Sequence, residues 1–169
     1  MKQLEVRLRG LDDLEGRVGW FPSAVYPDGT PVAYVAAIQE YGTKGIPPRL
    51  GMRETVSERK AEWRRVASVV SKRVLAGKMT GNDAMLFISQ TGEDDLADHI
   101  SHVSAPPLSE ITLVARKMRQ DGKKVTGATI GHIAAELAAG KSLPMSANTK
   151  PLNDTGYLLA TLSHAVVKT

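Results

Sequence analysis

The pattern of apolar and polar positions predicts strands at both ends of the chain. Residues 4–8 alternate Leu and Val with Glu and Arg, which is the period-two pattern of a half-buried strand. A polar turn is expected over 10–16, followed by a short apolar strand at 18–21. The Val pair at 166–167 predicts a closing strand. Both ends are therefore expected to contribute to one small sheet.

Helical spacing dominates the first half of the interior. Over 50–76, apolar residues recur every three or four positions opposite Arg, Lys and Glu, which predicts one long amphipathic helix. A shorter helix is expected over 31–41, between a capping Thr30 and a terminating Gly42. The expected inner stripe of the long helix is Met52, Val56, Trp63, Val66, Ala67, Val70 and Val74.

The second half of the interior also reads as helical. Residues 80–103 have helical spacing, but Thr-Gly at 91–92 interrupts it, which leaves one kinked helix and two helices open as alternatives. Ser109 is expected to cap a further helix, and a short one follows at about 129–139. Residues 151–162 are expected to form a loop that enters one or two helical turns.

These elements predict the α+β class. Strands at both ends, helices between them and no repeated strand–helix–strand unit favour a small, mainly antiparallel sheet with helices packed on it. The length of 169 residues fits a single domain, 1–169. A hydrophobic fraction of 42 % with 24 % charged residues excludes a disordered chain. The absence of Cys excludes disulfides and thiolate chemistry.

Charge is distributed unevenly along the chain. The net charge is only +4, but 44–78 has ten Lys and Arg against three acidic residues, whereas 79–110 has six acidic residues and no Lys or Arg. Residues 116–124 are basic again. Such runs are typical of solvated helix faces. Alternatively, the basic helix of one subunit meets the acidic helix of the next, in a head-to-tail contact that generates rings or filaments.

Candidate catalytic chemistry is sparse. His99 and His102 lie three residues apart, and Asp95 and Asp98 each stand four residues before one of them. On a helix this arrangement would supply half a metal site, and no spacing indicates the missing ligands. No nucleophile elbow or Ser-His-Asp arrangement is present. We therefore predict no catalytic, cofactor-binding or metal-binding residue, and keep a metal-dependent hydrolase only as a minor alternative.

Aromatic residues gather in the first quarter of the chain. Base stacking is one interpretation, but they are not interleaved with Arg and Lys as in a stacking platform. A local core between the N-terminal strands and the first helix is favoured. These residues are Trp20, Phe21, Tyr26, Tyr34 and Tyr41.

Four ordered stretches carry a family resemblance. Val-Gly-Trp at 18–20 leads into Tyr-Pro-Asp-Gly-Thr-Pro-Val-Ala at 26–33. Ala-Ala-Ile-Gln-Glu-Tyr-Gly-Thr follows at 36–43, then Ile-Pro-Pro-Arg-Leu-Gly-Met-Arg at 46–53, and Lys-Pro-Leu-Asn-Asp-Thr-Gly-Tyr-Leu at 150–158. In this order they resemble the tail-completion, or head–tail joining, proteins of long-tailed bacteriophages and prophages. Such proteins are also labelled minor tail protein Z-like or virion morphogenesis proteins.

The resemblance spans about 18–167 and implies a structural virion protein, not an enzyme. It implies a homo-oligomeric ring, six-fold, at the head-proximal end of the tail. Its partners would be the tail tube or tail terminator protein, the head–tail connector proteins, and DNA contacted without sequence readout in the lumen. The location would be the virion tail or neck, after assembly in the bacterial host cytoplasm, with no membrane and no cofactor. Residues 79–140 would be a helical insertion typical of larger members. The family usually reads Pro-x-Arg-Pro-Phe where this chain has Pro-Arg-Leu-Gly at 48–51.

The charge pattern selects candidate subunit-interface or lumen residues. Arg49 and Arg53 are expected near a helix N-terminus, where positive charge is unfavourable by roughly a few tenths of a kcal/mol. This positive charge is compensated by acidic groups of a neighbouring subunit or by DNA, or alternatively by Glu54 and Glu58 of the same chain. The alternative function is a basic nucleic-acid-binding protein, since the pI is about 9.4. The candidate residues are Arg49, Arg53, Arg59, Lys60, Arg64, Arg65, Asp94, Asp95 and Asp98.

Overall fold

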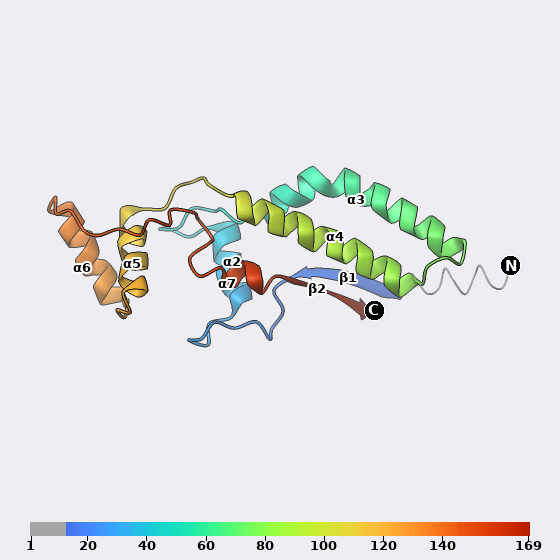
Figure 1. Cartoon of the computed structure of the whole chain (residues 1–169), viewed down its shortest axis with the longest axis horizontal. Coiled ribbons are helices and arrows are strands. Elements are labelled where there is room, and N and C mark those ends of the chain that lie inside the picture. The colour runs from blue at the N-terminus through green and yellow to red at the C-terminus, as the bar shows by residue number, and fades with distance from the viewer. Residues whose placement is uncertain (1–12) are drawn as a thin grey trace.

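The computed structural model describes residues 13–169 and has the predicted α+β class (Figure 1). The strand expected over 4–8 lies outside these residues. The long axis of the molecule runs from a helical pair at one end, through a central core, to a sheet-backed helical hairpin at the other. The elements are β1 (Leu14–Gly19), α2 (Val32–Tyr41), α3 (Met52–Leu75), α4 (Gly81–His102), α5 (Glu110–Gln120), α6 (Gly127–Ala138), α7 (Tyr157–Ala160) and β2 (Ser163–Lys168).

The two described strands join the ends of the chain. β1 pairs antiparallel with β2, from Leu14 opposite Lys168 to Gly19 opposite Ser163. The closing strand is confirmed, but the turn expected over 10–16 is wrong from Leu14 onward, because β1 begins there. A Cβ on Gly16 would lie 2.2 Å from Ser89 Oγ, so glycine at this position lets α4 approach the strand closely.

The α4 helix is the central element of the molecule. It runs unbroken from Gly81 to His102, so one helix is correct and the alternative of two is not. Thr91 does not cap a new helix, since its hydroxyl donates to the Phe87 carbonyl one turn earlier. One side of α4 covers both strands, where Glu93 contacts His164 of β2, and another side packs against α3.

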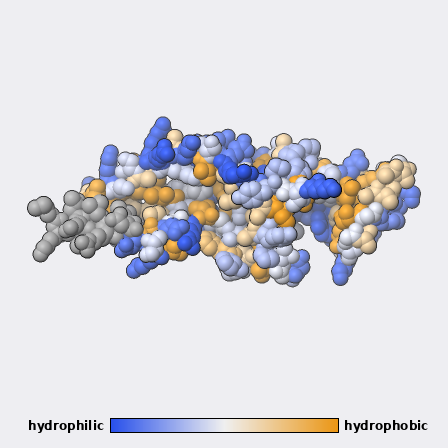
Figure 2. All heavy atoms as spheres, turned by 180° about the vertical axis from the view of Figure 1, so that it is seen from behind, coloured by the Kyte–Doolittle hydropathy of each residue, from blue (hydrophilic) through white to orange (hydrophobic). Residues whose placement is uncertain are grey.

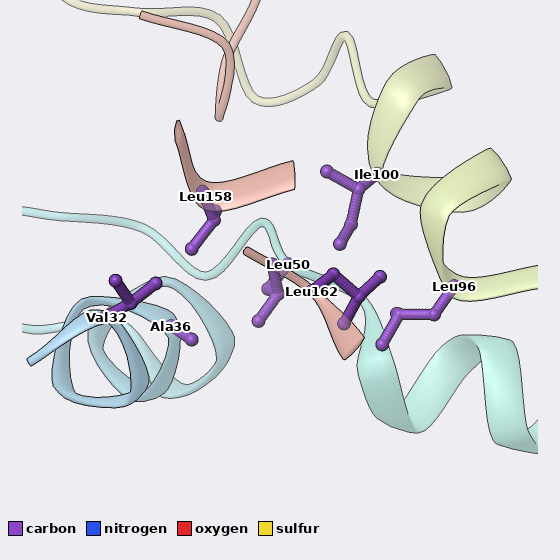
Figure 3. Packing of buried hydrophobic residues seen from close by; sticks show 7 residues of the cluster. All are labelled: Val32, Ala36, Leu50, Leu96, Ile100, Leu158 and Leu162. Carbon is purple, nitrogen blue, oxygen red and sulfur yellow. The ribbon is translucent and has the colours of Figure 1, made fainter. Parts of the chain in front are cut away.

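Among residues 13–169, buried apolar side chains form three clusters along the molecule. The tip of the α3–α4 hairpin has its own cluster around Val70, Val74 and Ala84, and the α5–α6 pair has another around Val114 and Ile133. Figure 2 shows apolar surface at the α5–α6 end, where Ile130 is 37 % exposed. The central cluster, shown in Figure 3, consists of Val32, Ala36, Leu50, Leu96, Ile100, Leu158 and Leu162.

These clusters bear on the insertion expected over 79–140. Leu96 and Ile100 of α4 belong to the central cluster together with residues of the first and last quarters of the chain. In contrast, α5 and α6 pack mainly on each other. The insertion therefore stays a prediction, and the part of it that packs separately is α5–α6.

Two expectations about burial are wrong. Val56, expected inside the long helix, is 49 % exposed, whereas its neighbour Thr55 is buried. Tyr34 and Tyr41 are also mostly exposed, although Trp20 and Tyr26 pack against the central cluster as expected. Tyr41 keeps one contact with a neighbouring helix, since the Arg53 guanidinium of α3 lies 4.9 Å from the centroid of its ring.

Candidate functional site

A groove of about 990 Å³ lies between the central core and α5. All four stretches singled out in the sequence contribute to its walls: Tyr26 to Asp28 from the first, Gln39 from the second, Ile46, Pro47 and Arg49 from the third, and Leu152 and Asp154 to Leu158 from the fourth. The loop that precedes α5 and one side of α5 complete it. Segments more than 100 residues apart in the sequence thus meet at one surface feature.

Glu40 holds the second and third stretches together. Its side chain is 6 % exposed and accepts hydrogen bonds from the backbone N–H groups of Met52 (2.8 Å) and Arg53 (3.2 Å) and from Arg53 Nε (2.8 Å). Burial alone would raise the pKa of the Glu40 carboxyl, but these hydrogen bonds outweigh burial and hold that pKa below its ordinary value. The last turn of α2 thereby caps the first turn of α3.

Gly51 lies where the beginning of α3 comes close to α4. It has φ of 71° and stands immediately before α3. A Cβ there would lie 2.1 Å from His99 Nε2 of α4. A bulkier residue would meet both a left-handed backbone and the His99 ring, so the close crossing of α3 and α4 requires glycine.

The fourth stretch is tied to the first by aromatic residues. Trp20 Nε1 donates to the Leu158 carbonyl at 2.7 Å, and the Tyr157 hydroxyl donates to the Val25 carbonyl at 2.7 Å. The rings of Tyr26 and Tyr157 lie 5.0 Å apart between centroids. These contacts make one wall of the groove aromatic.

Three arginines from two segments, Arg49, Arg116 and Arg119, line another part of the groove, which we call the arginine wall. Arg49 donates to the carbonyls of Pro106 (Nε, 2.8 Å) and Pro107 (Nη2, 3.0 Å), which anchors the loop after α4. Arg116 is buried on α5 and donates through Nη1 to the Asn148 and Lys150 carbonyls at 3.1 and 2.8 Å.

Asp154 is the carboxylate of this arginine cluster. Its oxygens lie 3.4 Å from Arg116 Nε and 2.8 Å from Arg119 Nη2. Burial lowers the pKa of Arg116, the Asp154 charge opposes that lowering, and the neighbouring Arg119 and Arg49 charges add to it. Two guanidinium groups, those of Arg116 and Arg119, therefore share one carboxylate, and Arg49 lines the same wall with carbonyl partners.

The candidate charged residues of α3 and α4 divide into paired and exposed groups. Asp95 accepts from Trp63 Nε1 at 2.6 Å and lies 3.5 Å from Arg59 Nε, so the basic and acidic helices already meet within one chain. Arg53 pairs with Glu40 and not with Glu54 or Glu58. Four candidates are exposed and form no ion pair within residues 13–169: Lys60, Arg64, Arg65 and Asp94.

The residues considered as half a metal site, Asp95, Asp98, His99 and His102, line one small pocket against α3, but their side chains do not converge. His102 Nδ1 lies 3.4 Å from Asp98 Oδ1, and His99 Nε2 lies 4.0 Å from Glu54 Oε2, while Asp95 turns toward α3. Within residues 13–169, no three His, Asp or Glu side chains gather as metal ligands would. The same residues include no helix of the length and apolarity required to cross a membrane.

Several residues of the site have no distinctive sequence signal. Arg116 lies inside the apolar pattern of α5. Because it is charged, sequence reasoning would expect it on the exposed side of the helix, whereas it is buried. Asp154 is part of the fourth stretch, but its partners come from a helix more than 30 residues earlier. Glu40 could be suspected only because an acidic residue at the end of a helix is unfavourable unless it has a partner.

Comparison with protein-family models, with curated proteins and with solved structures finds no match to this chain.

Proposed function

We propose that this chain is a structural virion protein that forms a ring at the head-proximal end of a phage tail and joins the tail to the head. The observation that supports the proposal best is the position of the four resembling stretches around one groove. Each stretch supplies one residue to the central cluster, namely Val32, Ala36, Leu50 and Leu158, and also supplies residues that line the accessible groove, so these motifs do more than fill the core. Such a surface suits docking of a neighbouring protein.

The proposal assigns no chemistry to the chain. Its partners are further copies of itself in a ring, six-fold, the tail tube or tail terminator on one side, and the head–tail connector proteins on the other. It places the protein in the neck of the virion after assembly in the bacterial host cytoplasm. DNA passing through the lumen would face basic side chains that tolerate phosphate without reading sequence.

The test is assembly with and without tail tubes. Size-exclusion chromatography with light scattering, at several protein concentrations, should show a ring-sized species, and electron microscopy should find it at one end of purified tubes. A chain that stays monomeric at every concentration and does not bind tubes would contradict the proposal. Heat-denatured protein provides the control for non-specific binding to tubes.

A second candidate function is non-specific nucleic-acid binding. It is favoured by one observation: Lys60, Arg64 and Arg65 are exposed on α3 and form no ion pair within residues 13–169. Basic side chains that are free of acidic partners are available to phosphate.

A further inference from the structure

The arginine wall of the groove carries unbalanced positive charge. Arg116 and Arg119 share Asp154, and Arg49 beside them donates only to the Pro106 and Pro107 carbonyls, so three guanidinium groups stand against one carboxylate at this wall. Asp28 also lines the groove, but its Oδ1 accepts from the Thr30 N–H, and it lies at the Tyr26 end. Within residues 13–169, Nη2 of Arg116 donates no hydrogen bond. The wall can therefore accept a further carboxylate.

The complementary surface lies on α4 of the same chain. Phe87 is 50 % exposed, and the exposed Asp94 and Asp98 follow it by seven and eleven residues. These spacings place the three side chains on one side of a helix, over a length of about 17 Å. Neither aspartate has a Lys or Arg partner within residues 13–169, and the Asp98 carboxylate lies 3.4 Å from His102 Nδ1. We call Phe87, Asp94 and Asp98 the α4 stripe.

We propose that the α4 stripe of one copy of this chain docks into the groove of the next copy. Asp94 and Asp98 lie against the arginine wall, and Phe87 lies among the apolar and aromatic side chains of the groove, such as Tyr26, Pro47 and Tyr157. This is the helix-in-groove mode of recognition, with anchors at the spacing of successive helical turns. The inference deepens the proposed function and rests on it for the closure of a ring.

The chemistry of the groove favours this occupant over a phosphate backbone. Much of its lining is apolar, contributed by prolines, Leu108, Leu152 and the Tyr26–Tyr157 pair. A hydrated polyanion would leave that surface uncovered, whereas the α4 stripe presents two carboxylates together with an aromatic side chain. Because α3 is already paired with α4 through Asp95, the contact between copies does not need the basic face of α3.

Stripe and groove are different surfaces of one chain, so the contact is not self-complementary. A contact of this kind leaves one free stripe and one free groove on every pair of copies. It therefore propagates into a ring where the rotation closes and into a filament where it does not.

Two charge-reversing variants test the contact. Asp94→Lys/Asp98→Lys disables the stripe, and Arg119→Glu disables the groove at a side chain that is 51 % exposed. By analytical ultracentrifugation, each variant alone should associate at least about tenfold more weakly than the wild type. Phe87→Ser should weaken association in the same direction. Circular dichroism melts confirm that each variant is folded.

Mixing the two variants gives the decisive result. The Arg119→Glu chain retains its stripe and the Asp94→Lys/Asp98→Lys chain retains its groove, so an equimolar mixture should form 1:1 dimers that grow no further. The matched control is Glu58→Lys/Glu62→Lys, which makes the same change of charge at the same spacing on α3 and should associate as the wild type does. Variants that assemble like the wild type, or a mixture that stays monomeric, would overturn the inference.

The two proposals fail in different ways. If the stripe and groove variants form rings and bind tail tubes as the wild type does, the docking contact is wrong and the proposed function stands. If the wild type forms open filaments that both variants disrupt, the docking contact stands and the ring is wrong, whereas a wild type that stops at a dimer contradicts the docking contact. A wild type that is monomeric at every concentration overturns the docking contact, and the tube-binding assay then decides the function separately.

Discussion

The backbone N–H of Met52 donates a hydrogen bond of 2.8 Å to the carboxylate of Glu40, which lies twelve residues earlier and is 6 % exposed. One buried side chain at the end of α2 thus accepts hydrogen bonds from the free backbone N–H groups at the beginning of α3. The loop between the two helices forms part of the groove. The stability of this junction and the shape of the groove therefore depend on the same residue.

Replacing Glu40 should destabilise the fold. Glu40→Gln keeps the shape of the side chain but replaces the charged carboxylate with a neutral amide. The carboxylate accepts hydrogen bonds from two backbone N–H groups and from the Arg53 side chain. We expect the free energy of unfolding to fall by about 1–3 kcal/mol, measured by urea denaturation. The control is Glu54→Gln, at an exposed position of the first turn of α3, which should cost less than about 1 kcal/mol. Equal losses in the two variants would contradict a special role for Glu40.

The same carboxylate should make stability depend on pH. The pKa of Glu40 is lower in the folded chain than its ordinary value of 4.5, so the unfolded chain binds the proton more tightly. The stabilisation is thus fully present above about pH 4.5 and is lost as the pH falls through the folded pKa. Urea midpoints between pH 3 and pH 6 should rise with pH, and the rise should be smaller in Glu40→Gln. An identical pH dependence in both proteins would exclude Glu40 as its source.

Gly51→Ala should be far more harmful than the same change at Gly122. Both glycines have positive φ, at 71° and 74°, but only at Gly51 does an added Cβ meet another side chain, His99 Nε2 at 2.1 Å. Backbone strain alone costs about 1–2 kcal/mol, which is the loss expected for Gly122→Ala. Gly51→Ala should cost about 2–4 kcal/mol in thermal or urea unfolding. The double variant Gly51→Ala/His99→Ala should recover part of the difference, and no recovery would mean that the ring is not the obstacle.

Arg116 should hold the segment after α6 against α5. Arg116→Met keeps the length of the side chain but leaves the Asn148 and Lys150 carbonyls without their donor. We expect a loss of about 2–4 kcal/mol. Hydrogen exchange should become faster at the Ser146 amide, which donates to the Leu113 carbonyl of α5. Arg119→Met, at a half-exposed ion pair, should cost no more than about 1 kcal/mol and leave that amide protected.

Non-specific DNA binding, if present, should depend on the exposed cations of α3. In the triple variant Lys60→Gln/Arg64→Gln/Arg65→Gln, affinity for duplex DNA at low salt should fall. The slope of log K against log salt should become shallower by about 0.9 for each phosphate contact removed. The charge-matched control is Lys123→Gln/Lys124→Gln/Lys150→Gln, away from α3, which should behave as the wild type. Wild-type protein that shows no binding to DNA at low salt would dispose of nucleic-acid binding as a function.

Local signals in the sequence were sufficient for most elements. The α3 helix can be identified from its sequence, because a helix that packs on one side has apolar residues at helical spacing along that side and polar residues elsewhere. The Ser109 cap and the ends of α2 and α5 at glycines are also local, since they satisfy backbone groups within a few residues. The continuity of α4 through Thr91 and Gly92 was not decidable locally, because it depends on β1 and α3 packing along the whole helix.

The sequence by itself determined the class of fold, the positions of the long helices and the uneven distribution of charge. Only the tertiary structure decided that Val56 faces solvent and that Asp95 is paired with α3 of its own chain. It alone places Arg49, Arg116 and Asp154 at one groove with the four motif stretches. The physical reason is that helix formation and capping depend on neighbours a few residues away. Burial, ion pairing and groove shape depend on which distant segments the core brings together.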